Sequence, residues 1–237
     1  MQFVWLIWSL ILIAIWLVIY AFLDSKDKRK EMLVVGLWTS LLGLTEPLFV
    51  PEYWNPPSLF NLAQQTGFDI ESLIFSFGIG GIAVILYEQI FQDRHTAMSS
   101  VERHFPRHKF HIWTILSTPA ILVILLIATN LNPLHSAVIA LIIGGLAAWY
   151  CRPDLKKKMI ISAFIFSALY FFYFLTLIAI SIAISPNYVE RVWNLKALSG
   201  ILIIGIPAEE LIFAFSFGFL WSSIYEHFKW RKIKGNH

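Results

Sequence analysis

Seven stretches of the sequence are apolar over about the length that crosses a lipid bilayer, roughly 20 residues for a helix. With 58% hydrophobic and 14% charged residues, the 237-residue chain has more apolar surface than a water-soluble fold can hide. The sequence therefore predicts an all-α, polytopic membrane protein with seven transmembrane helices. We place the spans at residues 2–22, 33–50, 70–91, 111–129, 134–150, 159–184 and 200–228.

The Lys and Arg residues lie on alternate predicted loops, which is typical of cytoplasmic loops in membrane proteins. Sixteen of the eighteen follow the first, third, fifth and seventh spans, against Arg191 and Lys196 on the other side. We therefore expect a multi-pass protein of the cytoplasmic membrane, with its N-terminus outside and its C-terminus in the cytoplasm. No basic residue precedes the first apolar stretch and no small-residue cleavage site follows it, so we expect it to stay in the mature chain. The net charge of +3 reflects topology and does not indicate nucleic-acid binding.

The start of the third span resembles the start of the seventh at a shift of 138 residues. Residues 68–75 (FDIESLIF) and 206–213 (IPAEELIF) share an acidic position, and the spans end on Tyr87-Glu88 and Tyr225-Glu226. Apolar segments resemble each other easily, whereas a shared acid and a shared Tyr-Glu are harder to obtain by chance. The resemblance indicates an internal duplication.

This duplication predicts a single membrane domain over residues 1–237. Residues 1–91 would form the first three-helix repeat, 111–129 a connecting helix, and 134–228 the second repeat. Because a shift of four spans preserves direction, we expect parallel repeats related by an axis along the membrane normal. A site shared by both repeats would lie between them, near the third and seventh spans.

Acidic residues at the outer ends of the predicted spans are the most informative candidates for chemistry. Glu209 and Glu210 directly follow Pro207 at the start of the seventh span, where the helix dipole favours a carboxylate. One interpretation is that these acids cap the start of the helix. The other is functional, because an acid inside a membrane is energetically costly and usually faces the interior of the helix bundle. A neutral carboxylic acid beside an ionised one suits acid–base chemistry on an apolar substrate. The further acids expected at this level are Glu71, Asp69 and Glu46.

Aromatic residues follow these acids at helical spacing. Phe213 and Phe217 come four and eight residues after Glu209, and Phe75 comes four residues after Glu71. Packing and lipid contact explain such rings in many helices. Alternatively, they line a cavity and stabilise a cation, at about 2 kcal/mol or more per desolvated contact. Tryptophans near the span ends, among them Trp54 and Trp193, are typical of interfacial anchors.

Several other site types are not expected. His104 and His108 have metal-ligand spacing, but their basic loop supplies no third ligand, so we predict no metal site. Asp24 and Asp27 have no second acidic cluster to complete a magnesium–diphosphate site. The single Cys151 excludes an intramolecular disulfide and is interpreted as an ordinary residue at a helix end. No nucleotide-binding motif is present, and no cofactor is expected.

Residues 207–213 (PAEELIF), followed by Tyr225-Glu226, resemble the Pro-x-Glu-Glu-x-x-Phe segment of the membrane lycopene cyclase domain family. That family includes heterodimeric bacterial and fused archaeal and fungal cyclases, and it carries the segment once per half. In the first half of this chain the motif is incomplete, because Asp69 replaces the proline and Ser72 the second glutamate. The resemblance extends to length, number of spans and duplication.

The resemblance implies a redox-neutral isomerisation of a linear carotene. A carboxylic acid protonates the terminal double bond, the neighbouring alkene attacks the cation, and loss of a ring proton gives a β-ionone end. Glu209 or Glu210 would be the proton donor and Glu71 its electrostatic partner or base. Phe213, Phe217, Phe75, Glu46 and Asp69 would line the substrate site.

The partners implied are a lipid-soluble carotenoid or other isoprenoid and the membrane lipids, with a homo- or hetero-oligomer left open. Two alternatives remain at this point. A small-solute carrier can also have parallel three-helix repeats, but it should place polar residues at mid-bilayer, whereas the acids here gather at one end. A non-catalytic carotenoid- or isoprenoid-binding protein is favoured by the incomplete first motif.

Overall fold

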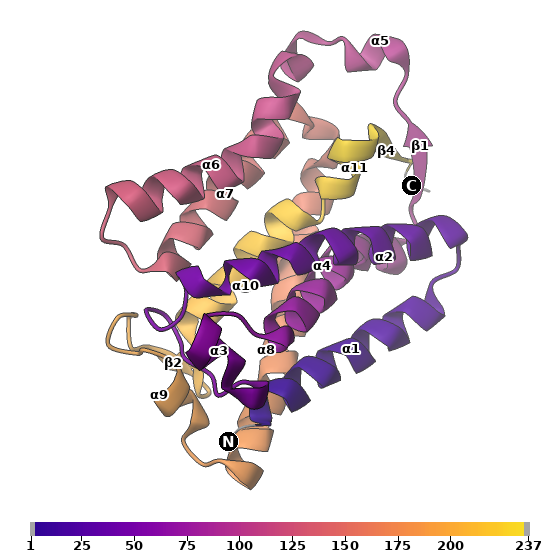
Figure 1. The fold of residues 1–237 in the computed structure, drawn as a ribbon. Coiled ribbons are helices and arrows are strands. Elements are labelled where there is room, and N and C mark those ends of the chain that lie inside the picture. The colour runs from indigo at the N-terminus through magenta and orange to yellow at the C-terminus, as the bar shows by residue number, and fades with distance from the viewer. Residues whose placement is uncertain (1–2, 235–237) are drawn as a thin grey trace.

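The computed structural model describes residues 3–234 and is mostly helical, as the composition predicts (Figure 1). Short helices and 3₁₀ turns connect the long helices. The short elements are η1 (Leu41–Leu48), η2 (Leu59–Asn61), α3 (Leu62–Thr66), α5 (Ser100–Arg103), η3 (Pro106–Phe110), η4 (Pro153–Leu155), α9 (Tyr188–Val192) and α11 (Ile224–Lys229). The long helices are α1 (Val4–Phe22), α2 (Lys26–Ser40), α4 (Ile70–Phe91), α6 (His111–Ala128), α7 (Pro133–Cys151), α8 (Lys156–Ile184) and α10 (Ala208–Trp221).

Two short antiparallel ribbons join segments outside the long helices. Strand β1 (Arg94–Ala97) pairs with β4 (Arg231–Lys234), which ties the loop after α4 to the C-terminal tail. Strand β2 (Leu202–Ile203) pairs with β3 (Ile206–Pro207) directly before α10. The sequence analysis predicted neither ribbon.

Within residues 3–234, five helices are long and apolar enough to cross a membrane. They are Val4–Phe22, Ile70–Phe91, Pro106–Ala128, Pro133–Cys151 and Pro153–Ile184. These five agree with the first, third, fourth, fifth and sixth predicted spans and support a membrane protein. The second and seventh predicted spans are not single helices of that length.

The second and seventh predicted spans need correction. Around 33–50, α2 begins at Lys26 and gives way to the 3₁₀ helix η1 at Leu41. Around 200–228, residues 202–207 form the β2–β3 ribbon, and α10 begins only after Pro207. A turn at Ser222–Ser223 then separates α10 from α11. Because Pro207 lacks a backbone N–H and has a fixed φ, it suits the boundary of a helix better than its interior.

The helices pack as two groups of three with matching contacts. Helices α1 and α2 pack on α4, and helices α7 and α8 pack on α10, while α4 touches both α8 and α10. The loops before α4 and α10 meet in a bridge between Trp54 and Trp193. At the other ends, Glu88 of α4 and Glu226 of α11 contact the same Lys158. Helix α4 and the α10–α11 segment therefore run side by side in the same direction.

Helix α4 is the most buried of the long helices and packs through its glycines. A Cβ at Gly80 would collide with the Thr39 side chain of α2, and one at Gly81 would collide with Trp16 of α1. These positions therefore let α1 and α2 approach the backbone of α4.

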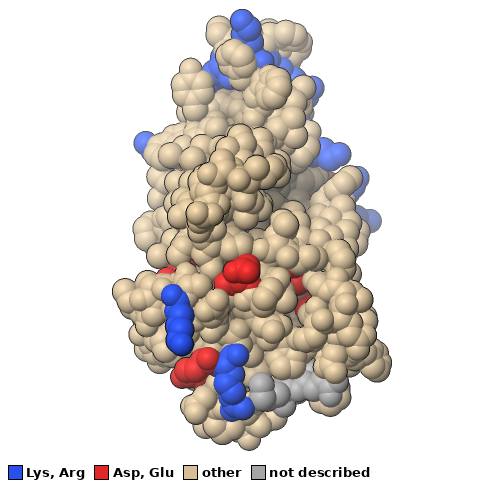
Figure 2. All heavy atoms as spheres, turned by 60° about the vertical axis from the view of Figure 1, so that its left-hand side comes forward, with Lys and Arg blue, Asp and Glu red and all other residues tan. Residues whose placement is uncertain are grey.

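Helix α6 is the least embedded helix. It packs mainly on α7, with which it forms a hairpin at one side of the bundle (Figure 1). Figure 2 shows most Lys and Arg side chains toward the end that carries α5, and few at the end that carries α9.

Candidate functional site

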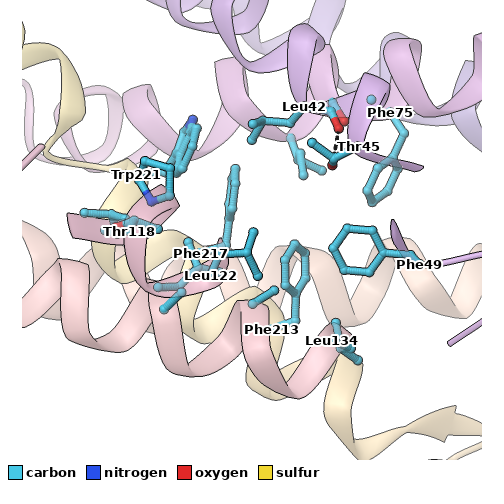
Figure 3. Close-up of a pocket in the computed structure, with 18 of the residues that line it drawn as sticks. Leu42, Thr45, Phe49, Phe75, Thr118, Leu122, Leu134, Phe213, Phe217 and Trp221 are labelled. Carbon is cyan, nitrogen blue, oxygen red and sulfur yellow. Dashed lines mark hydrogen bonds between the residues drawn. The ribbon is translucent and has the colours of Figure 1, made fainter. Parts of the chain in front are cut away.

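A cavity of about 470 Å³ lies between the two helix groups, with walls from η1, α4, α6, α7, α8, α10 and α11. Its volume is within the range of small-molecule sites, roughly 300–1,000 Å³. The lining is mostly aliphatic and aromatic, and Phe49, Phe213 and Phe217 point into the same space in Figure 3. Of the residues predicted from the sequence, the cavity brings together Glu210, Glu46, Phe75, Phe213 and Phe217.

Glu210 lies in the first turn of α10 and has hydrogen-bond partners on both carboxyl oxygens. The Tyr53 hydroxyl and the Trp193 Nε1–H donate to Oε1, the latter at 2.8 Å. The Tyr170 hydroxyl donates to Oε2 at 2.8 Å. Among the described residues, no Lys, Arg or His forms an ion pair with Glu210. The site thus holds one acid in a fixed orientation, among neutral donors and inside an apolar cavity.

Glu46 is the second carboxyl group on the cavity wall. It comes from η1, is 8% exposed, and lies near Asp69, Ser72 and Trp54. Its Oε1 has no hydrogen-bond partner among the described residues. This oxygen is therefore a polar group on the cavity wall that no described side chain satisfies.

Glu209 and Glu71 do not line the cavity, although both are buried. Glu209 accepts a hydrogen bond from the Ser199 backbone N–H at 2.6 Å, and His135 lies 3.9 Å from its carboxylate. Glu71 accepts one from the Leu59 backbone N–H at 2.7 Å. Each acid therefore holds the loop before its own helix, and the two do so in the same way.

Asp69 also lies outside the cavity lining, in a capping role. Its carboxylate accepts hydrogen bonds from the Ser72 backbone N–H at 2.5 Å and from Trp5 Nε1 at 3.2 Å. This is the usual role of an Asp before the first turn of a helix. These hydrogen bonds fix the start of α4. Ser72 lines the cavity there, at the position of α4 that corresponds to Glu210 on α10.

Aromatic rings form a continuous layer along the cavity. Phe213 and Phe217 have centroids 5.7 Å apart, and Phe217 stacks on Trp221 at 4.6 Å. On the other group of helices, Phe75 packs against Trp8 at 5.8 Å, and Trp8 stacks on Tyr173 at 4.6 Å. These faces are able to stabilise positive charge inside the apolar cavity.

The sequence analysis missed the three side chains that hold Glu210. Tyr53 and Trp193 lie in the loops before α4 and α10, and Tyr170 lies in the middle of α8. Trp193 was interpreted as an interfacial anchor, but its indole N–H points to a buried carboxylate. Only the predicted duplication offered a signal for Tyr53 and Trp193, because their loops precede the two helix starts that resemble each other.

A second group of charges lies at the opposite ends of the same helices. Lys158 contacts Glu88 and Glu226, at 2.5 Å each, and His95 lies 3.0 Å from Glu226 and 3.2 Å from Glu88. Glu31 of α2 lies 3.4 Å from the other ring nitrogen of His95. The side chains are at most 5% exposed. This ion cluster joins α2, α4, α8, α11 and β1 at the two Tyr-Glu pairs, Tyr87-Glu88 and Tyr225-Glu226.

The ion cluster strongly affects the titration of His95, which lies outside the membrane-spanning helices. Burial lowers its pKa, but hydrogen bonds to Glu226 and Glu88, together with the charges of Glu226 and Glu31, outweigh burial. The result is a pKa raised from 6.5 to about 10. A protonated His95 is therefore part of the folded structure at neutral pH.

Comparison with known proteins supports the resemblance noted in the sequence. The family model described as lycopene cyclase matches residues 132–228, which include α7, α8, α10 and the Glu209-Glu210 pair. The comparisons with curated proteins and with solved structures found no match.

Proposed function

We propose that the chain is a carotenoid cyclase that forms β-ionone rings, because the family model described as lycopene cyclase matches residues 132–228. The reaction is a redox-neutral isomerisation of a linear carotene. Glu210 carries this proposal, because it is the acid of the family-like motif that lies in the cavity. The cavity lies between helix groups that we propose to be the two parallel repeats of one seven-span domain.

Glu210 is the proton donor in this proposal. A buried charge is costly unless a cation pairs with it, and the partners of Glu210 are the neutral Tyr53, Tyr170 and Trp193. The neutral acid is therefore favoured in the empty cavity. Once the proton has passed to the substrate, the same three donors stabilise the carboxylate that remains.

The aromatic walls stabilise the cation that protonation creates. The proton adds to the terminal double bond of the carotene and leaves a tertiary carbocation. Phe213, Phe217 and Phe75 present ring faces along the cavity, and an apolar cavity keeps water from capturing the cation. The neighbouring alkene then attacks the cation and closes the six-membered ring.

Loss of a ring proton completes the reaction and balances the first step. The Glu210 carboxylate takes this proton back, which regenerates the neutral acid for the next turnover. No electron donor or acceptor is needed, because the product is an isomer of the substrate. Glu71 and Glu209 contribute by fixing the loops before α4 and α10, which carry Tyr53 and Trp193.

We also propose that the reacting end lies in the outer leaflet. The Glu210 end of the bundle is the end that carries α9, where basic residues are few (Figure 2). A long hydrocarbon dissolved in the bilayer would then enter from the side, with its reacting end in the cavity.

Lycopene-accumulating cells provide the test. We expect wild-type protein to convert lycopene into ring-containing carotenes, and Glu210→Gln to reduce the rate by roughly 10²–10⁴-fold, as for loss of a general acid. Glu209→Gln should have a smaller effect, because this acid holds a loop. The matched control is Glu190→Gln, an exposed acid of α9, which should retain wild-type activity.

Separation of the pigments by chromatography measures both rate and product. A Glu210→Gln variant that cyclises lycopene at the wild-type rate would refute the assignment of the acid. Wild-type protein that retains bound lycopene without converting it would instead indicate a binding protein. Equal amounts of folded protein must be compared, which fluorescence size-exclusion chromatography verifies.

A further inference from the structure

A separate cluster of metal-binding side chains lies at the far end of α6 and α7 from Glu209. His108 belongs to η3, His111 begins α6, and Cys151 ends α7. All three are buried, at 6%, 6% and 1% exposure. One potential ligand atom from each lies within 4.8 Å of the others. The cavity chemistry proposed above uses none of these three side chains.

The distances in this cluster are close to those of a tetrahedral metal site. Nδ1 of His108 lies 3.4 Å from the Cys151 Sγ, and Nδ1 of His111 lies 3.3 Å from it. In a tetrahedral zinc site, with Zn–S of about 2.3 Å and Zn–N of about 2.0–2.1 Å, sulfur and nitrogen are about 3.5 Å apart. A small inward or outward shift of side chains is therefore sufficient to accommodate an ion.

The hydrogen bond on the far side of His111 prepares its ring as a ligand. Its Nε2 lies 3.1 Å from the backbone carbonyl of His227, and a carbonyl only accepts. Nε2 therefore carries the proton, which leaves the Nδ1 lone pair directed at the sulfur. In metal sites, the ring nitrogen of a histidine ligand that does not bind the metal commonly donates its N–H to a backbone carbonyl. The indole of Trp230 stacks on the ring at 3.9 Å and fixes its plane.

The cluster brings two imidazole nitrogens and one thiol sulfur together. Without a metal, the thiol hydrogen serves Nδ1 of His111 while an Nδ1–H of His108 donates to the sulfur. A metal ion would use the thiolate and both Nδ1 lone pairs at once. The neighbouring Arg152 does not oppose this, because Asp154 pairs with it at 2.7 Å.

We propose that His108, His111 and Cys151 bind one thiophilic divalent ion of the zinc class. Three protein ligands leave a fourth position, which a water molecule can occupy. This proposal replaces the prediction of no metal site. His104 is not part of the cluster, because its ring bonds to the Ser100 carbonyl instead.

The ion would act as a clip that fixes α6 to α7. Helix α6 packs mainly on α7, and it forms one wall of the cavity through Thr114, Thr118 and Leu122. Because His111 also bonds to the His227 carbonyl, the clip extends to α11. Metal binding would thereby set the position of a cavity wall without taking part in the ring closure.

The test measures metal directly in the purified full chain, in detergent, with any affinity tag removed. We expect about one zinc per chain after purification and dialysis against zinc-free buffer. Substitution with Co²⁺ should produce the intense thiolate-to-metal absorption and the visible bands of a tetrahedral site. Cys151→Ser and His111→Gln should lose both signals, whereas His104→Gln, an exposed histidine outside the cluster, should retain them.

Wild-type protein supplies a readout that does not depend on the folding of variants. Removal of metal with a chelator should lower the unfolding temperature, and added Zn²⁺ should restore it. Wild-type chain with no bound zinc and no cobalt–thiolate absorption would overturn the proposal, as would a Cys151→Ser variant that binds zinc like the wild type. Neither result bears on cyclase activity, since no carotenoid is present.

Discussion

Replacement of His95 tests the ion cluster, because this side chain contacts three buried carboxyl groups. In the folded chain its pKa is about 10, against 6.5 for an ordinary histidine. A group whose pKa is raised by folding contributes its full stabilisation at every pH below the pKa that it has in the unfolded chain, here about 6.5. That contribution is lost as pH rises toward about 10. His95→Gln removes the charge but keeps a side chain that can form hydrogen bonds.

The pKa shift sets the expected size of the effect. One pKa unit corresponds to about 1.4 kcal/mol, so the shift from 6.5 to about 10 sets an upper limit near 5 kcal/mol. Relaxation and water entry at the end of the helices reduce this value, and we expect about 2–3 kcal/mol in the free energy of unfolding at neutral pH. The wild-type protein should therefore lose this contribution to its free energy of unfolding between about pH 6.5 and about pH 10.

Thermal unfolding in detergent, followed by tryptophan fluorescence, measures this difference. The wild-type unfolding temperature should fall steadily across the pH window, whereas His95→Gln should be less stable near neutrality and change little. His104→Gln is the matched control and should follow the wild type, because His104 is exposed and outside the ion cluster. Parallel curves for wild type and His95→Gln would refute the reasoning.

The other predictions concern packing and the acid. Lys158→Met should destabilise the fold by roughly 3–5 kcal/mol, because it leaves His95 as the one remaining cation of the ion cluster beside the buried Glu88 and Glu226. Acid pH should partly restore the unfolding temperature. Gly80→Ala should cost about 1–3 kcal/mol, since its Cβ would meet the Thr39 side chain, and chemical unfolding detects the loss. Tyr170→Phe removes a hydrogen bond to Glu210 and should slow cyclisation roughly tenfold without loss of folded protein, which pigment analysis and size-exclusion chromatography measure together.

Helix geometry decides part of the placement of the candidate site residues. Pro207 does precede the first turn of α10, and both Glu209 and Glu210 lie in that turn. Phe213 and Phe217 line the cavity together with Glu210. Adjacent residues on a helix differ by about 100°, so Glu209 and Glu210 face different directions, and Glu210 is the one that lines the cavity. Local pattern alone did not decide which one.

The seven-span prediction illustrates a limit of hydropathy. Residues 202–207 are apolar enough to continue a span, yet they form a ribbon that turns at Ile204-Gly205, where φ is +54° and +79°. The apolar composition of a segment indicates that the segment lies in an apolar environment. It does not determine whether the backbone is helical. Pro207 and the ribbon together set where α10 begins.

The sequence by itself determined the membrane class, the position of acids at helix starts and the apolar faces behind them. These features depend on residue type and on spacings of a few residues, which helix geometry converts directly into position. Tertiary structure alone brought Tyr53, Tyr170 and Trp193 to Glu210, because these residues are up to 157 positions away along the chain. It likewise joined Cys151 to His108 and His111, 43 and 40 residues distant, since the α6–α7 hairpin returns the chain to the same end of the bundle.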